Sequence, residues 1–286
     1  MVDVLLTMLI LTSTYVIISI ATELLIGHTG LMTLWVGALV GVGAYAASIL
    51  SLRFGVPYPL ALLAAMAITA LIGVVISLPT LPLRHEYFLI GSLATQVVVG
   101  AVLVNLTDLT GGAGGMSGIT RPAILNSMTA YAAWGLVLVV LVWYLARRIE
   151  RSTMGLALRA VREDEVAAES VGVSVPRAKL AVTLVSSAFM ALAGAHLAFF
   201  LTALDPSSFR LDMTIMAMTM VVVGGSGSLR GAVLGAVLIT LLPHLIELLP
   251  IRSENFGLVN NLVYGALLVL FMLFRPRGIW PQRAEH

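Results

Sequence analysis

The chain has 286 residues, of which 59% are hydrophobic and only 10% are charged, and its formal net charge is +2. About a quarter of the residues of a soluble domain are charged, so the mean hydropathy of +1.04 excludes a water-surrounded globule and indicates a protein that lies in lipid. The absence of cysteine excludes disulfides and thiolate metal sites. No basic run with interleaved aromatic residues appears, so we expect no nucleic-acid partner.

Nine apolar segments are candidates for membrane spans, since a spanning helix needs about 20 apolar residues. In chain order they are residues 4–21, 31–51, 58–77, 86–106, 128–146, 179–203, 213–224, 231–250 and 257–274. The seventh is too short to cross alone, so we expect a tilted or broken span there. The start of the chain lacks the features of a signal peptide, which makes the first segment a retained span. The predicted fold is a single all-α polytopic membrane domain over residues 1–286, with about nine (eight to ten) transmembrane helices.

The distribution of Lys and Arg predicts the orientation of these spans, because basic residues are held on the cytoplasmic side. With nine spans, one of the two orientations places 12 of the 16 basic residues on one side. The other side keeps Arg53, Arg121, Arg210 and Arg252. We therefore expect the N-terminus outside and the C-terminus in the cytoplasm. A glycine-rich outer loop then covers residues 107–127, where "LTGGAGGMSGIT" favours tight turns with positive φ.

A polar segment at residues 147–178 interrupts the apolar sequence on the cytoplasmic side. Seven of the twenty residues from Leu158 to Arg177 are charged, and both signs occur. Composition alone leaves open a solvated loop that simply follows the positive-inside rule. Acidic residues such as Glu163 and Glu169 contribute nothing to topology, however, so the mixed charge favours a docking surface for another protein.

Capping signals divide this segment into two short helices. Ser152 or Thr153 can cap the first, Asp164 can cap the second, and Gly172 suits the left-handed position that ends a helix. Ser174 can cap the helix that follows. The small and apolar residues expected to meet a partner are Leu156, Ala160 and Val161 on the first helix and Val166, Ala167 and Ser170 on the second.

The stretch "GLALRAVREDEVAAESVGVSVPRAKL" resembles the cytoplasmic loop of the permease subunits of branched-chain amino acid ABC transporters, of the LivM type. The likeness extends over roughly residues 25 to 280, in order. It includes "GVGAYAA" at 41–47, "LTGGAGGMSGI" at 109–119, "SSAFMALAGAHLAFF" at 186–200, "DPSSF" at 205–209, "VVVGGSGSLRGAVLGA" at 221–236 and "FRPRGIW" at 274–280.

The resemblance implies a transport subunit of an importer in the cytoplasmic (inner) membrane of a bacterium or archaeon. The implied partners are a second, related but unlike permease, two cytoplasmic ATPase subunits and an external substrate-binding protein. No phosphate-binding G-x-x-x-x-G-K-[ST] pattern occurs, so ATP is expected on the partner subunits and no cofactor or catalytic residue on this chain. The residues implied to couple to the ATPase are Arg159, Arg162, Glu163, Asp164, Glu165, Ala167, Ala168, Glu169 and Gly172.

Polar residues inside spans suggest a route for the substrate, because lipid does not solvate them. Ser92 and Gln96 lie four residues apart, on one helix face, with Thr95 adjacent. Gly30 and Trp35 follow the first span, where a broken helix would expose backbone groups to a ligand. We assign all five to a candidate pathway. The alternative for Ser92 and Gln96 is hydrogen bonding between helices.

The remaining ionisable residues have structural interpretations. Glu23 follows the first predicted span, and a helix end at the inner interface is the favoured interpretation. His196 and His244 are expected to be packing residues. Because no cluster of His, Asp and Glu has convincing metal-ligand spacing, we expect no metal site. Gly194 and Gly235 are expected to let helices pack closely.

The sequence leaves alternatives open for the substrate and for the class of function. Trp35, Val36 and Val97 depart from the pattern of the resembled family, so urea, short amides or small organic acids stand beside leucine, isoleucine and valine as substrates. An ion-coupled secondary carrier would leave the polar segment unexplained. An intramembrane serine protease would pair Ser226 with His244, but about 27 Å of helix separates them.

Overall fold

The structure is a computed structural model that describes residues 2–80, 85–122, 125–247, 265–266, 269 and 279–280. Within these residues, six helices are long and apolar enough to cross a membrane. They are α1 (Val2–Thr29), α2 (Val36–Phe54), α3 (Tyr58–Ser77), α4 (His85–Asn105), α6 (Met128–Glu150) and α9 (Val175–Leu201). Two further apolar helices follow, α10 (Leu211–Gly224) and α11 (Leu229–Glu247). The predicted polytopic all-α architecture is therefore confirmed, whereas the predicted ninth span at 257–274 lies almost wholly outside the described residues.

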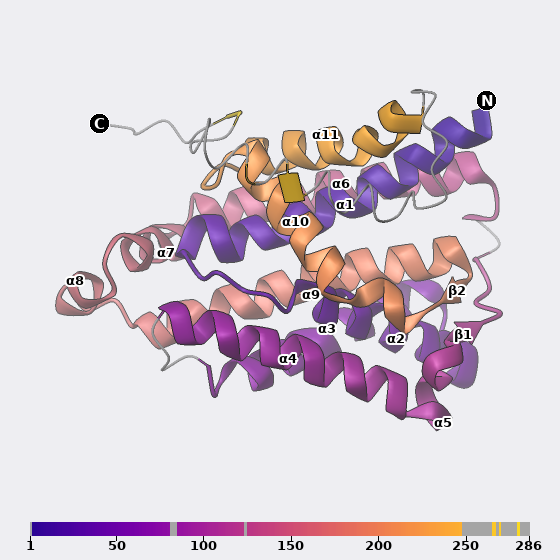
Figure 1. The fold of residues 1–286 in the computed structure, drawn as a ribbon, viewed down its shortest axis with the longest axis horizontal. Helices are drawn as coiled ribbons and strands as arrows, with labels where there is room; N and C mark the ends of the chain where they lie inside the picture. The colour runs from indigo at the N-terminus through magenta and orange to yellow at the C-terminus, as the bar shows by residue number, and fades with distance from the viewer. Residues whose placement is uncertain are drawn as a thin grey trace.

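The first two spans differ from their predicted bounds. α1 continues to Thr29 instead of ending at residue 21, and α2 starts at Val36 instead of residue 31. Gly30, at φ +71°, ends α1, and the chain between the two helices runs back into the bundle as a non-helical segment (Figure 1). The uncharged stretch of α1 ends at Glu23, but the helix continues beyond this residue. It can continue because the rest of the protein buries the side chains of Glu23 and His28.

The central element is α9, which packs against α1, α2 and α3 and is buried over most of its length (Figure 1). Glycines allow the close approach of α2 and α9, since a Cβ on Gly194 would overlap the carbonyl oxygen of Val40 and one on Gly43 would overlap Ala191. A Cβ on Gly235 would likewise overlap the carbonyl oxygen of Met220, so α10 and α11 pack equally closely. The packing roles predicted for Gly194 and Gly235 are confirmed.

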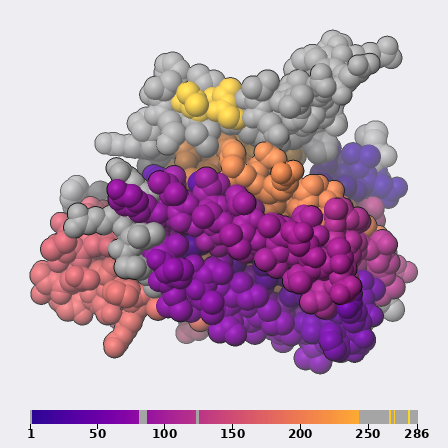
Figure 2. Space-filling view, turned by 60° about the horizontal axis from the view of Figure 1, so that its bottom comes forward, coloured from indigo at the N-terminus to yellow at the C-terminus, as the bar shows by residue number. Residues whose placement is uncertain are grey.

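The two ends of the helix bundle carry different structures. At one end, α7 (Thr153–Glu163) and α8 (Glu165–Ser170) project beyond the long helices (Figures 1 and 2). At the opposite end lie α5 (Thr107–Thr110), the 3-10 helix η1 (Gly112–Gly114) and a two-stranded antiparallel sheet of β1 (Met116–Ser117) and β2 (Ala203–Leu204). We call these the α8 end and the sheet end.

Glycine and a capping aspartate shape the sheet end. Gly115 adopts φ +72°, and a Cβ there would overlap the carbonyl oxygen of Leu204, so the turn requires glycine, as the sequence predicted. Asp205 caps η3 (Pro206–Phe209) by accepting hydrogen bonds from the Ser207 amide at 2.8 Å and the Ser207 hydroxyl at 2.6 Å. These hydrogen bonds from Ser207 lower the pKa of the Asp205 carboxyl below its ordinary value.

Candidate functional site

Capping residues set the ends of the two helices at the α8 end. Asp164 accepts hydrogen bonds from the amides of Val166 at 2.8 Å and Ala167 at 3.1 Å, which satisfies two amides that the start of α8 leaves unpaired. Gly172 follows α8 at φ +87°, in the left-handed region. Both predictions are confirmed. Ser152 occupies the predicted N-cap position of α7, but its hydroxyl donates to the carbonyl of Ile149 at 2.7 Å instead of capping.

The helices α7 and α8 each present an inner and an outer face. On α7, Leu158 and Val161 are buried, whereas Leu156 is 64% exposed. On α8, Ala168 is buried and Val166 is 77% exposed. The outer face that a partner could contact therefore includes Leu156, Val166, Ala167, Ser170 and Val171. The prediction that Val161 belongs to this face is wrong, because the helical spacing from Leu158 places Val161 against the bundle.

The residues implied to couple to an ATPase fall into two groups. Glu163, Ala167, Glu169 and Gly172 are exposed. The others have contacts within the chain. Glu165 pairs with Lys179 at 2.8 Å, and Arg159 lies 4.0 Å from Glu150. Arg162 donates to the carbonyl of Gly27, Asp164 caps α8, and Ala168 is buried. Arg162 and Ala168 thus face the bundle, whereas Asp164 is exposed and Arg159 and Glu165 are partly exposed beside their partners in the chain.

We call Glu23, His28 and Glu150 the buried ion cluster. It lies between α7 and the bundle, with Glu23 and His28 buried and Glu150 half-buried. Glu23 is fully buried, and its Oε1 accepts a 2.6 Å hydrogen bond from the amide of Gly227, in the turn between α10 and α11. The two ring nitrogens of His28 lie 3.5 Å from Oε1 of Glu23 and 3.5 Å from Oε1 of Glu150. A buried carboxylate is tolerated where partners compensate its desolvation.

Sequence reasoning missed this cluster. The interpretation of Glu23 as a helix end at the interface is wrong, because α1 continues six residues past it, to Thr29. The available signal was Gly27, which lies four residues after Glu23 and so shares its helix face, with His28 next to it. A glycine on the same face leaves room for a carboxylate to fold back against the helix.

Ser92 and Gln96 hold the buried start of α2. The hydroxyl of Ser92 accepts from the amide of Leu34 at 2.9 Å. Gln96 accepts from the amide of Ala38 at 2.8 Å and donates to the carbonyl of Phe209 at 2.8 Å. The polar groups of both side chains therefore bond to backbone of other elements, which is the interhelical alternative that the sequence left open.

The five candidate pathway residues do not form one cluster. Trp35 is fully buried and meets Phe88 edge to face, with ring centroids 5.4 Å apart, beside the contacts of Ser92 and Gln96. Thr95 is half-buried, and its hydroxyl bonds to the carbonyl of Gly91 in its own helix at 3.0 Å. Gly30 lies at the α8 end, where a Cβ would be 3.5 Å from Cγ of Arg162. Gly30 is thus closer to α7 than to Ser92.

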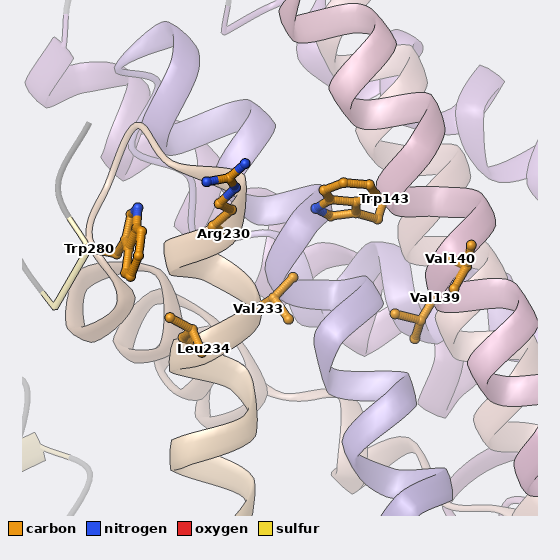
Figure 3. Close-up of a pocket in the computed structure, with 7 residues that line it drawn as sticks. All are labelled: Val139, Val140, Trp143, Arg230, Val233, Leu234 and Trp280. Carbon is orange, nitrogen blue, oxygen red and sulfur yellow. The ribbon is translucent and has the colours of Figure 1, made fainter. Parts of the chain in front are cut away.

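A groove of about 500 Å³ lies on the outside of the bundle between α6 and α11 (Figure 3). Its lining is apolar apart from Arg230, with Trp143 and Trp280 on opposite sides. It contains none of the candidate pathway residues. In the described part of the chain, no group of three or more His, Asp and Glu could hold a metal.

The protease alternative finds no support in the geometry. Ser226 lies in the turn before α11, next to the Gly227 amide that binds Glu23. His244 lies 15 residues into α11, which starts at Leu229, and this length of helix spans about 22 Å. A nucleophilic serine needs its histidine within hydrogen-bond reach, so the two residues do not form a catalytic pair.

Comparison with known proteins identifies the family. The family model described as "Branched-chain amino acid transport system / permease component" matches residues 4–272. The chain is 30% identical to the high-affinity branched-chain amino acid transport system permease protein LivM of Escherichia coli, over 95% of this chain and 68% of the relative. It is 27% identical to the probable LivM of Methanocaldococcus jannaschii, over 78% of this chain and 68% of the relative.

Similarity also extends to a second type of permease. The chain is 26% identical to the permease protein LivH of Salmonella typhimurium, over 94% of this chain and 92% of the relative. No solved structure matches the chain. The match to the family model over most of the sequence, together with an apolar helical bundle, shows that this chain belongs to the permease component family of branched-chain amino acid transport systems.

Proposed function

We propose that this chain is the LivM-type permease subunit of an ATP-binding cassette importer that carries leucine, isoleucine and valine across the cytoplasmic membrane of a bacterium or archaeon. The family membership and the names of the relatives support this substrate class. The chain itself forms part of the route and hydrolyses nothing, since ATP binds to partner subunits.

The single structural observation that carries the proposal is the exposed face of α7 and α8. Leu156, Val166 and Val171 are 64–77% exposed on α7, on α8 and directly after α8, which project from the end of the bundle. Exposed apolar residues flanked by charges such as Glu163 and Glu169 are typical of a protein-binding surface. We assign this face to the ATPase, which places the α8 end in the cytoplasm.

The remaining partners follow from the same assignment. The importer contains a second permease, for which the LivH-type relatives offer the model, and an external binding protein that delivers the amino acid to the sheet end. The candidate pathway consists of Trp35, Ser92, Thr95 and Gln96, where α2 begins inside the bundle. Its side chains are neutral, which suits a zwitterion better than an ion with a net charge.

Uptake by the reconstituted importer tests the proposal. The chain is assembled with its second permease, ATPases and binding protein in proteoliposomes, and ATP-dependent uptake of radiolabelled leucine, isoleucine and valine is measured. We expect uptake of all three amino acids with ATP and none without it. Urea, a short amide and a small organic acid are offered as competing substrates. Uptake of these competitors in place of the amino acids would contradict the substrate class. ATP-independent uptake driven by an ion gradient would contradict the importer.

A further inference from the structure

Three elements meet at the last turns of α1. Arg162 of the coupling helix α7 donates to the carbonyl of Gly27, and Glu150, the last residue of α6, lies beside His28. The amide of Gly227, in the turn between α10 and α11, donates to Glu23. The buried ion cluster therefore joins the coupling segment to a turn that is remote in the sequence and separate from the docking face.

This junction is closely packed and buried. Glu23 is fully buried and His28 is 2% exposed, so water does not compete for their contacts. Hydrogen bonds to a charged acceptor are roughly twice as strong as neutral ones. Gly27 leaves the space in which the Glu23 carboxylate lies, because a Cβ on Gly27 would overlap the carboxylate oxygens. Gly227 adopts φ +93°, which favours glycine in the turn that presents the amide to Glu23.

The α10–α11 pair extends the connection towards the candidate pathway. A Cβ on Gly224 would overlap the carbonyl oxygen of Gly231, so the two helices are in backbone contact next to the turn. At the far end of α10, Thr214 accepts a 2.9 Å hydrogen bond from the amide of Gly37 and donates to the carbonyl of Leu34 at 3.3 Å. These contacts connect the turn, through α10, to the buried start of α2.

We propose that Glu23 and His28 are positioning residues that transmit movement of α7 to the α10–α11 pair, and through it to the start of α2. This inference rests on the proposed function as an ATP-driven importer. Neither residue touches the ATPase or the substrate in this scheme. Breaking the cluster separates ATP hydrolysis from loading of the binding protein while the ATPase stays attached.

Four variants of the complete importer in lipid nanodiscs test the inference. Glu23→Ala removes the carboxylate, and Gly27→Ala displaces it by filling its space. Glu23→Gln keeps an acceptor for the Gly227 amide but removes the charge beside His28. Gly100→Ala is the matched control, because it is also a helical glycine and a Cβ there meets nothing within 4 Å.

The measurements are co-purification of the ATPases, the melting temperature, basal ATP hydrolysis and its stimulation by the leucine-loaded binding protein. We expect all four variants to retain the ATPases and basal hydrolysis. Stimulation should fall at least about fivefold in Glu23→Ala and Gly27→Ala, the lower end of usual coupling between sites. Glu23→Gln should lie between these and wild type, and Gly100→Ala should match wild type.

The outcomes separate this inference from the proposed function. Wild-type stimulation in both Glu23→Ala and Gly27→Ala overturns the transmission role and leaves the importer intact. If those two variants fail to assemble while Glu23→Gln shows full stimulation, the cluster has only a structural role. That outcome also overturns the transmission role. A wild-type complex that no loaded binding protein stimulates removes the proposed function, and the inference with it.

Discussion

The start of α2 lies inside the bundle, where its first amides have neither water nor an intrahelical partner. Side chains from other helices supply the missing acceptors: Thr214 for Gly37 and Gln96 for Ala38 in α2, and Ser92 for Leu34 just before it. These hydrogen bonds allow a helix to begin at membrane depth, since an unpaired backbone group there costs several kcal/mol. Polar residues in the apolar spans therefore stabilise an irregular backbone, whatever they also contact during transport.

Gln96→Leu tests this arrangement at the residue scale. The variant leaves the amide of Ala38 and the carbonyl of Phe209 unpaired, which costs about 1–3 kcal/mol for each buried group. We expect a lower melting temperature of the purified permease and a loss of leucine uptake, with the subunits still assembled. Thr183→Val is the control, because the Thr183 hydroxyl is buried and bonds to the carbonyl of Lys179 in its own helix, α9. A full loss of uptake at an unchanged melting temperature would instead indicate direct contact with the substrate.

At the scale of elements, the sequence predicted more about where helices lie than about which way their side chains point. Apolar runs located the spans, and Asp164 and Gly172 set the limits of α8 through local geometry that a few residues determine. The length of α1 and the inward direction of Arg162 were not predictable in the same way. Both depend on Glu23, His28 and the carbonyl of Gly27, which are brought to their partners by the folding of distant segments.

Val166→Asp tests the outer face of α8. Val166 is 77% exposed, so the substitution leaves the bundle unchanged, while an apolar contact that is central to an interface contributes more than about 1 kcal/mol. We expect roughly tenfold weaker binding of the ATPase, which corresponds to about 1.4 kcal/mol, at an unchanged melting temperature. Binding is measured by titrating detergent-solubilised permease with labelled ATPase.

Leu109→Asp provides the control for Val166→Asp. Leu109 is also an exposed apolar residue, but it lies in α5 at the sheet end. Its substitution should leave ATPase binding at the wild-type value. Equal weakening by both variants would indicate a general effect of added charge, and no weakening by Val166→Asp would exclude the outer face of α8 as the docking surface.

At the scale of the whole molecule, the distribution of basic residues favours the orientation that the proposed function requires. The basic residues of the α8 end, such as Arg147, Arg148 and Arg151, outnumber those of the sheet end, and basic residues are retained in the cytoplasm. The exposed apolar face of α7 and α8 is the surface that we propose for the cytoplasmic ATPase. In this proposal the sheet end, with its glycine turns, faces outward, where we propose that the binding protein docks.

Labelling of single cysteines tests this orientation. The chain has no native cysteine, so Ser117→Cys and Ser170→Cys each introduce one exposed thiol, in β1 at the sheet end and in α8 at the other end. In intact cells, we expect a membrane-impermeant maleimide to label Ser117→Cys and not Ser170→Cys, and permeabilisation to expose both. Because the two sites lie at opposite ends of the bundle, labelling of both from outside would place α7 and α8 on the same side of the membrane as the sheet. That result would remove the cytoplasmic ATPase from the surface assigned to it, even though the family of the chain would stand.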